Sequence, residues 1–486
     1  MEAADDGLGA DQGPGDQRSS RQGGWHELSA GDAAQFEPTR VRPSLCVLQP
    51  WGPVARDFEA VGIRPAFLDR RGGDPRRLLD LMRLVRAQEP DLLFRSGPKS
   101  NLPGRLVARW SGVPAVLRFN NMLPEAAGMV LVQRRLASST AAAVAVSNAV
   151  QQWASRQYAL PPELIRVVYS GRDFDRFAAP APDARARIRH EFAIGEDAAL
   201  IGRLGRVLAR QKGQDLMIRL MPELRQRRPD AVLLIVGDGP DLETCRRSAA
   251  ELGLNGTVGF AKRRGDIPDL LAAVDVVVVP SIVEEAFGFA ALEASAAGRP
   301  VVAFRSGGLA EVVVHGETGL IVPKGDGAGL CDALVRILDD PALARRLGER
   351  GRRQPAGFTV ARNVQGLTEF FEEIVRQVAT RSLPSPGASD AGLTRFVHPA
   401  SSFSLGARPT SQPRARYRPR RSGLRRGLVE EPGRLCLLVP IGPLRRLRAS
   451  AAGTPALFSH LPSSPGRASL VGRASLVGTG ARAQLG

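Results

Sequence analysis

Two stretches of the chain alternate short apolar runs with helical periodicity. The first, from about residue 41 to 180, predicts strands at 45–48, 66–68, 92–94, 115–117, 143–146 and 167–169. The second follows a joint rich in proline, alanine and aspartate at 178–184, and predicts strands at 199–204, 232–236, 257–260, 276–279, 301–304 and 320–322. Runs of β-branched residues that alternate with helices are typical of a parallel sheet covered on both faces. The pattern therefore predicts two doubly wound α/β domains, with ligand sites at the carboxyl ends of the strands.

The helices between these strands follow from their apolar faces and end signals. Asp74 and Pro75 are a natural N-cap and first helical residue for a helix that Pro90 stops. Further helices are predicted at 214–227, 242–252, 290–297 and 330–338, and a last amphipathic helix at 360–378. We assign residues 23–180 to a first domain and residues 181–380 to a second.

The two ends of the chain lack this periodicity. Residues 1–22 are mainly glycine, aspartate, glutamine and serine, and predict a disordered N-terminus. Residues 381–486 are rich in arginine, proline and serine, and predict a disordered tail without a core. The first domain then lacks an apolar strand at its start, so its first strand is missing or altered.

The tail also changes the meaning of the net charge of +18, because residues 381–486 hold 17 arginines against three acidic residues. With one tyrosine among its clustered arginines, the tail is a weak signal for specific nucleic-acid binding. The four cysteines are far apart and form no metal-binding pair, which predicts neither a disulfide framework nor a zinc site. The chain shows no signal peptide and no apolar run long enough to span a membrane, so we expect a cytoplasmic protein.

Candidate chemistry is densest between residues 284 and 308. The loop that leaves the strand 276–279 carries Glu285, and Gly288 allows a tight turn before a helix that carries Glu293. The N–H groups at such a helix start favour an anion, and we expect a phosphate there. The two carboxylates repel phosphate, so they suit hydroxyl-rich parts of the same ligand; the simpler interpretation of Glu285 is a helix-capping charge.

Several motifs add to this one, and together they resemble the family 4 (group 1) glycosyltransferases. The spacing of Glu285 and Glu293 is similar to the E-x7-E signature of that family. The other matching segments are Gly205-Arg206-Val207, Lys212-Gly213, Val236–Pro240, Pro280-Ser281, Gly307-Gly308 with Glu311, Gly316–Leu320, Glu89-Pro90-Asp91, Val146-Ser147 and Ser170–Asp173. The resemblance covers roughly residues 21–380.

The resemblance implies the GT-B fold, in which two Rossmann-like domains face each other across a cleft, and a nucleotide-sugar donor held mainly by the second domain. It implies retention of configuration at the transferred sugar. Arg206 and Lys212 would hold the donor diphosphate, Glu285 would contact the sugar near the reacting centre, and Glu293 would bind the ribose. The N–H groups of Phe287, Gly288 and Phe289 would complete the phosphate site. Fixed cations and helix amides can stabilise the charge of the leaving group, so we expect no metal and no cofactor.

On the acceptor side, Gly23 and Gly24 are similar to the glycine-rich loop of the family with one extra residue, and Asn120 stands where the family often has a histidine. The resemblance implies a carbohydrate or lipid-linked acceptor, and peripheral membrane association is a further expectation. The pair Asp173 and Asp175 matches the D-x-D signature of another glycosyltransferase fold, but its place in the chain favours a structural role.

Two alternatives remain open at this point. One is a catalytically impaired GT-B protein that binds polyanions or a membrane surface through its basic tail. The other is a GT-B nucleotide-sugar epimerase, which needs no acceptor. Transfer of a sugar by the purified protein distinguishes the predicted enzyme from both.

Overall fold

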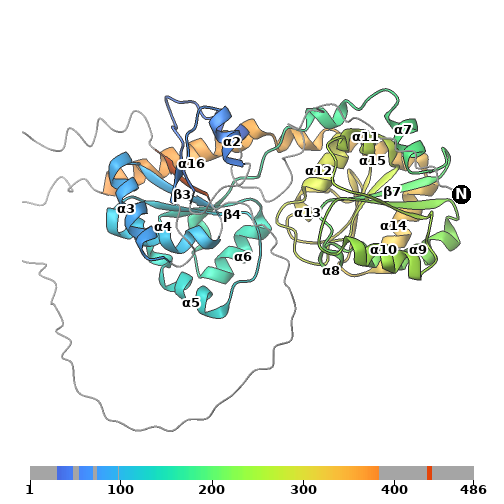
Figure 1. Ribbon diagram of the computed structural model, residues 1–486, viewed down its shortest axis with the longest axis horizontal. Helices are drawn as coiled ribbons and strands as arrows, with labels where there is room; N and C mark the ends of the chain where they lie inside the picture. Colours follow the sequence, from blue (N-terminus) through green and yellow to red (C-terminus); the bar gives the residue numbers. More distant parts are fainter. Residues whose placement is uncertain (1–29, 48–53, 69–73, 97, 382–434, 440–486) are drawn as a thin grey trace, which may run out of the picture. The chain divides into compact units, whose positions relative to one another are not determined.

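The computed structural model describes residues 30–47, 54–68, 74–96, 98–381 and 435–439 (Figure 1). Its first sheet has seven strands in the order β2-β1-β13-β3-β4-β5-β6. Their bounds are Ser44–Val47 (β1), Ala66–Phe67 (β2), Leu92–Ser96 (β3), Ala115–Phe119 (β4), Ala142–Ala145 (β5), Ile165–Val167 (β6) and Leu435–Val439 (β13). All neighbours pair in parallel except β13, which is antiparallel to both β1 and β3.

The second sheet has six strands in the order β12-β11-β10-β7-β8-β9, and every pair is parallel. Its strands are Ala199–Leu204 (β7), Ala231–Val236 (β8), Val258–Ala261 (β9), Val276–Val279 (β10), Val301–Phe304 (β11) and Gly319–Val322 (β12). All twelve predicted strands are present, and the largest shift is at β6, which begins two residues earlier than the pattern predicts. The prediction of an α/β fold with two Rossmann-like sheets is confirmed.

Helices connect the strands and cover both faces of each sheet (Figure 1). The predicted helix at 214–227 is present with the same bounds. The helix Arg76–Gln88 begins one residue later than predicted, with Pro75 as its N-cap, and Asp74 accepts a hydrogen bond from the Arg76 N–H at 2.9 Å. The α-helices are Ala30–Ala34 (α1), Val54–Ala60 (α2), Arg76–Gln88 (α3), Pro98–Ser111 (α4), Ala127–Arg135 (α5), Asn148–Tyr158 (α6), Ala184–Glu191 (α7), Ala209–Lys212 (α8), Gln214–Arg227 (α9), Leu242–Glu251 (α10), Ile267–Ala273 (α11), Phe289–Ala296 (α12), Leu309–Val312 (α13), Gly327–Asp339 (α14), Pro341–Gly351 (α15) and Val360–Arg381 (α16). Short 3₁₀ turns lie at Ala137–Ser139, Pro162–Leu164, Asp175–Ala178 and Gln354–Gly357.

The second sheet is buried between two apolar layers. One layer contains side chains of α7, α11, α12 and α13, and the other contains side chains of α9, α10 and α14. Because both faces are covered, the strands consist of apolar residues and glycine except for Arg203 in β7, and all four residues of β10 are valine. The polar residues that follow the strands are therefore held on a rigid support.

The last helix corrects the predicted domain boundary. Its buried residues Leu367, Phe370 and Phe371 belong to the same apolar cluster as Leu45 and Phe94 of the first sheet. The rings of Phe371 and Phe94 lie edge to face, 4.9 Å apart. The periodicity of 360–378 predicts an apolar face but cannot tell which sheet that face covers, so the assignment of 360–380 to the second domain is wrong.

Strand β13 is the second correction, because the composition of residues 381–486 predicts no regular structure. Cys436 pairs with Cys46 of β1 on one side and with Arg95 of β3 on the other. The short apolar run at 435–439 has the length of a strand, but nothing local in the sequence links it to residues 44–96. The rest of the predicted tail and the predicted disordered N-terminus lie outside the described residues.

Within the described ranges, we find no helix that combines the length and the apolar character needed to cross a bilayer.

Candidate active site

The site begins where strand β7 ends. Arg206 follows the strand with an exposed side chain, and no ion pair of Arg206 occurs within the described part of the chain. The short helix α8 then ends at Lys212, and Gly213 turns the backbone with a φ of +74°. A Cβ on Gly213 would lie 2.1 Å from the carbonyl oxygen of Pro280, so only glycine allows this approach. The turn brings Lys212 to the carboxyl end of β10.

Lys212 and Glu285, which are 73 residues apart in the sequence, form an ion pair. The Nζ atom of Lys212 lies 2.6 Å from Oε1 of Glu285, and the hydroxyl of Ser281 donates to the same oxygen at 2.5 Å. The two charged side chains are 26% and 17% exposed, so both reach solvent and neither is sealed in the core. The structure therefore brings together two of the three predicted catalytic residues.

Burial acts to raise the pKa of Glu285, but the Lys212 ammonium, the Ser281 hydroxyl and the Arg203 guanidinium outweigh it, and the net pKa is lower than that of an ordinary glutamate. The backbone at Glu285 is also held in place: its N–H donates to Ser306 Oγ at 3.2 Å, and its carbonyl accepts from the Gly308 N–H at 2.7 Å. Glu285 is thus an ionised carboxylate on a fixed loop, which is more than a helix-capping charge.

The predicted phosphate-binding turn precedes α12. Gly288 has a φ of +117°, and a Cβ there would lie 2.7 Å from a methyl carbon of Leu309. Phe287 and Phe289 on either side are buried, with ring centroids 4.9 Å apart. The aromatic pair anchors the backbone, so the first N–H groups of α12 keep a constant position next to the Glu285 loop.

Glu293 lies in α12 and is paired with Arg172 in the structure. The Arg172 guanidinium also lies 4.4 Å from the centroid of the Phe289 ring, and burial lowers the pKa of Arg172 to about 10. The sequence motif at 170–173 identified this segment without giving Arg172 a partner. A ligand hydroxyl that is to bind Glu293 has to share this carboxylate with Arg172.

Glu311 in α13 is another residue whose role the motif alone did not define. Its carboxylate accepts from the N–H groups of Asn148 and Ala149 at 3.0 and 2.9 Å, and from the Tyr169 hydroxyl at 3.0 Å. Burial, followed by this hydrogen bond, raises the pKa of Tyr169 to about 12. Glu311 is therefore occupied by the start of α6, where a carboxylate also meets the positive end of the helix dipole.

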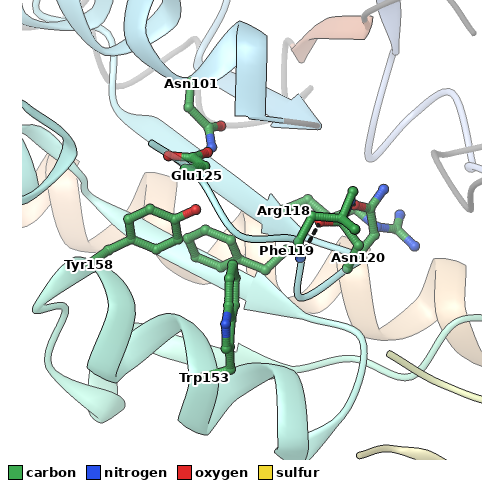
Figure 2. Close-up of a pocket in the computed structure, with 9 residues that line it drawn as sticks. Asn101, Arg118, Phe119, Asn120, Glu125, Trp153 and Tyr158 are labelled. Atoms are coloured by element: carbon green, nitrogen blue, oxygen red, sulfur yellow. Dashed lines mark hydrogen bonds between the residues drawn. The ribbon is translucent and has the colours of Figure 1, made fainter. Parts of the chain in front are cut away.

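Asn120 follows strand β4 and stands where the family often has a histidine, but an amide does not titrate near neutral pH. Its amide donates to Ser96 Oγ at 3.3 Å and accepts from the Asn121 amide at 3.1 Å. Asn120 lines a small cavity of about 10 Å³ (Figure 2), which is room for one water or hydroxyl oxygen. Gly23 and Gly24 lie outside the described residues.

The same cavity contains a carboxylate that pattern reasoning missed. Both carboxylate oxygens of Glu125 are buried, and neither makes a hydrogen bond of standard geometry within the described residues. Burial raises the pKa of Glu125, and the nearby Tyr158 hydroxyl and Arg105 guanidinium act in the opposite direction. No motif marks Glu125, because a single glutamate in a loop has no distinctive spacing.

Asp173 and Asp175 form a local turn, in which the Asp175 N–H donates to Asp173 Oδ1 at 3.0 Å. This agrees with a structural role. Within the described part of the chain, no group of three or more histidine, cysteine, aspartate or glutamate side chains could hold a metal ion. Independence from metals stays a prediction.

Comparison with known families gives two matches that follow the two sheets. Residues 34–176 match the family described as Glycosyltransferase Family 4, and residues 184–354 match Glycosyl transferases group 1. The second match contains Arg206, Lys212, Glu285 and Glu293.

Curated relatives share about a third of their aligned residues with this chain. A GDP-mannose-dependent alpha-(1-6)-phosphatidylinositol monomannoside mannosyltransferase of Mycolicibacterium smegmatis is 39% identical over 255 residues, which are 50% of this chain and 61% of the relative. A D-inositol 3-phosphate glycosyltransferase of Corynebacterium jeikeium is 36% identical over 219 residues, which are 43% of this chain and 52% of the relative. The chain thus spans between about half and three fifths of these relatives.

Solved structures show the same fold at lower identity. HepE of Anabaena, determined in complex with UDP, has a TM-score of 0.61 and 23% identity, and the match covers 67% of this chain and 90% of HepE. A glycosyltransferase from Rickettsia africae also has a TM-score of 0.61, with 19% identity and coverage of 68% and 90%. These likenesses confirm the GT-B architecture that the motifs implied.

Proposed function

Because the chain belongs to the group 1 (family 4) glycosyltransferases, we propose that it transfers a sugar from a nucleotide diphosphate donor to an acceptor hydroxyl, with retention of anomeric configuration. The observation that carries this proposal is the Lys212–Glu285 pair at the carboxyl end of β10, next to the start of α12. A diphosphate brings negative charge to a place that offers one ammonium, the exposed Arg206 and the N–H groups of a helix start.

The chemistry follows from these charges. As the bond between the sugar and the diphosphate breaks, the leaving group gains negative charge and the sugar gains positive charge. Lys212 and Arg206 stabilise the first, and Glu285, whose pKa lies below the ordinary value, supplies a carboxylate for the second. Glu293 is the proposed partner of the ribose hydroxyls and competes for them with Arg172.

The two relatives indicate which substrates to try first. One is named for GDP-mannose and a phosphatidylinositol mannoside, and the other for D-inositol 3-phosphate. We therefore propose a GDP- or UDP-sugar as the donor and an inositol-containing, carbohydrate or lipid-linked acceptor. A cytoplasmic location, with peripheral contact to the membrane where a lipid acceptor lies, is part of the same proposal.

The test uses the full chain. Binding of GDP, UDP and ADP is measured by isothermal titration calorimetry, and transfer from GDP-mannose and UDP-glucose is measured with D-inositol 3-phosphate and phosphatidylinositol as acceptors. Product anomers identified by NMR decide between retention and inversion. Nucleotide binding without transfer to any acceptor would favour the impaired GT-B protein, and sugar isomerisation without an acceptor would favour the epimerase.

A further inference from the structure

Arg203 is a buried cation directly beneath the proposed donor site. It lies in β7, one residue before the strand ends, and is 3% exposed. Its Nε and Nη2 atoms donate to the carbonyl of Lys212 at 3.3 and 3.1 Å, and Nη1 donates to the carbonyl of Leu204. The guanidinium therefore braces the turn that carries Lys212. Neither the motifs nor the family resemblance gave Arg203 a role.

The charges around Glu285 are unequal in number. Lys212 forms an ion pair with Glu285, and Arg203 attracts the same carboxylate without contacting it. Burial lowers the pKa of Arg203 to about 10, so its guanidinium is still charged at neutral pH. One carboxylate thus has two cations, of which only Lys212 is at the surface.

The other charged groups on neighbouring elements are exposed or occupied. Glu284 is paired with Lys324, and Glu311 binds the N–H groups of Asn148 and Ala149. Arg206 is exposed. Arg203 is therefore the second cation available to Glu285 from the elements that surround it in the described part of the chain.

A bound diphosphate would draw Lys212 away from Glu285. A partly buried carboxylate that loses its only cation has to take up a proton or bear a large desolvation cost. We propose that Arg203 is a positioning residue that keeps Glu285 ionised while Lys212 exchanges Glu285 for the donor diphosphate. The exchange rests on the proposed function, whereas the attraction between Arg203 and Glu285 does not. Glu285 is then still a carboxylate when positive charge develops on the sugar.

The first experiment needs no ligand. Lys212→Ala leaves Glu285 with Arg203 as its only nearby cation. Adding Arg203→Gln removes that second positive charge but keeps an amide that can donate to the backbone carbonyl of residue 212. Urea unfolding of both variants is followed from pH 5 to pH 8. Without either cation, the pKa of Glu285 in the folded protein should lie above its value in the unfolded chain. The folded protein then binds more protons than the unfolded one, so the free energy of unfolding should fall as pH rises.

We expect this fall in the Lys212→Ala, Arg203→Gln variant. The slope of its unfolding free energy against pH should correspond to about one proton. Lys212→Ala with Arg203→Lys keeps the charge and should lack the fall, as should the triple variant that adds Glu285→Gln. Arg227→Gln, which removes a surface partner of Asp332 in the same domain, is the matched control. Equal pH profiles for the Gln and Lys variants at position 203 would overturn the proposal and leave Arg203 a purely structural brace.

The second experiment follows the exchange itself. GDP or UDP is titrated into wild type, Arg203→Gln and Arg203→Lys in buffers of different ionisation enthalpy at pH 7. The Arg203→Gln variant should take up about one proton per nucleotide bound, so its affinity should fall about tenfold for each unit by which the pH is raised. Wild type and Arg203→Lys should take up no proton. Binding to the Gln variant without proton uptake would overturn the exchange. If wild type binds no nucleotide, the proposed function fails, and the unfolding series still decides the role of Arg203.

Discussion

The two sheets of this protein are built from similar sequence patterns but are completed in different ways. The second sheet takes its six parallel strands from one continuous stretch, Ala199 to Val322. The first sheet takes six strands from residues 44–167 and a seventh, antiparallel strand from residues 435–439. The difference shows that a strand in the middle of a sheet can come from a distant part of the chain, provided that it forms main-chain hydrogen bonds with both of its neighbours.

The importance of strand β13 for the first sheet follows from its main-chain pairing. It pairs with β1 and with β3 over four residues each, so both neighbours use it as a partner. Without it, two strand edges in the middle of a sheet would lack main-chain partners, which is costly for buried groups. The second sheet has no comparable dependence, because each of its strands is linked to the next by a local crossover helix.

The strongest way to break this comparison is to delete residues 431–444. Several buried main-chain hydrogen bonds would be lost at about 1 kcal/mol each, so we expect the melting temperature to fall by about 10 °C. Differential scanning calorimetry measures the change, and a deletion of equal length at 401–414 is the control. A melting curve that does not move would show that the first sheet is stable without β13, as the composition of the tail predicts.

Substitutions of Glu285 and Glu293 test whether the residues next to the second sheet determine turnover and donor affinity. Glu285→Ala should reduce turnover by about 100-fold, since it removes a charge opposite the developing positive charge, and should change donor affinity less. Glu293→Ala should mainly weaken donor binding, by about 1–3 kcal/mol. Steady-state kinetics and calorimetry with each variant separate the two effects. Equal and small changes in both quantities would contradict the division of roles.

Lys212 and Arg206 should determine donor affinity without help from a metal. Each charge-assisted hydrogen bond is worth about 1.5–3 kcal/mol, so Lys212→Ala and Arg206→Ala should each weaken nucleotide binding at least about tenfold. Activity in excess EDTA should equal activity with Mg²⁺, and Asp173→Asn with Asp175→Asn should bind donor normally. Loss of activity in EDTA, with rescue by Mn²⁺, would move the donor site to the D-x-D pair.

The smallest effect is expected on the first sheet. Asn120 is a neutral amide with a 3.3 Å hydrogen bond to Ser96, and the net worth of such a bond is about 1 kcal/mol. Asn120→Ala should leave donor affinity unchanged and lower transfer about fivefold or less, as measured by single-turnover transfer to the acceptor. A larger loss of transfer at unchanged donor affinity would indicate that Asn120 binds the acceptor directly. The first sheet would then carry the acceptor site and the second sheet the donor site.

Local order was readable from the sequence wherever it depends on periodicity or on a turn residue. The twelve strands of the two tandem series and the helix Gln214–Arg227 follow from apolar runs and their spacing. The positions of Lys212 and Glu285 at strand ends followed in the same way, because the carboxyl ends of parallel strands share one edge of the sheet. These features involve residues that are close in sequence or repeat at fixed intervals.

Partners that are far apart in sequence were decided by the tertiary structure alone. Periodicity gives α16 an apolar face, but only packing shows that Phe371 meets Phe94 of the first sheet. An arginine in a strand reads as a surface charge until the fold buries Arg203 against the Lys212 turn, and Arg172 has no visible partner until α12 presents Glu293. The physical reason is that a pattern specifies how a segment folds, whereas burial and pairing depend on which other segments arrive beside it.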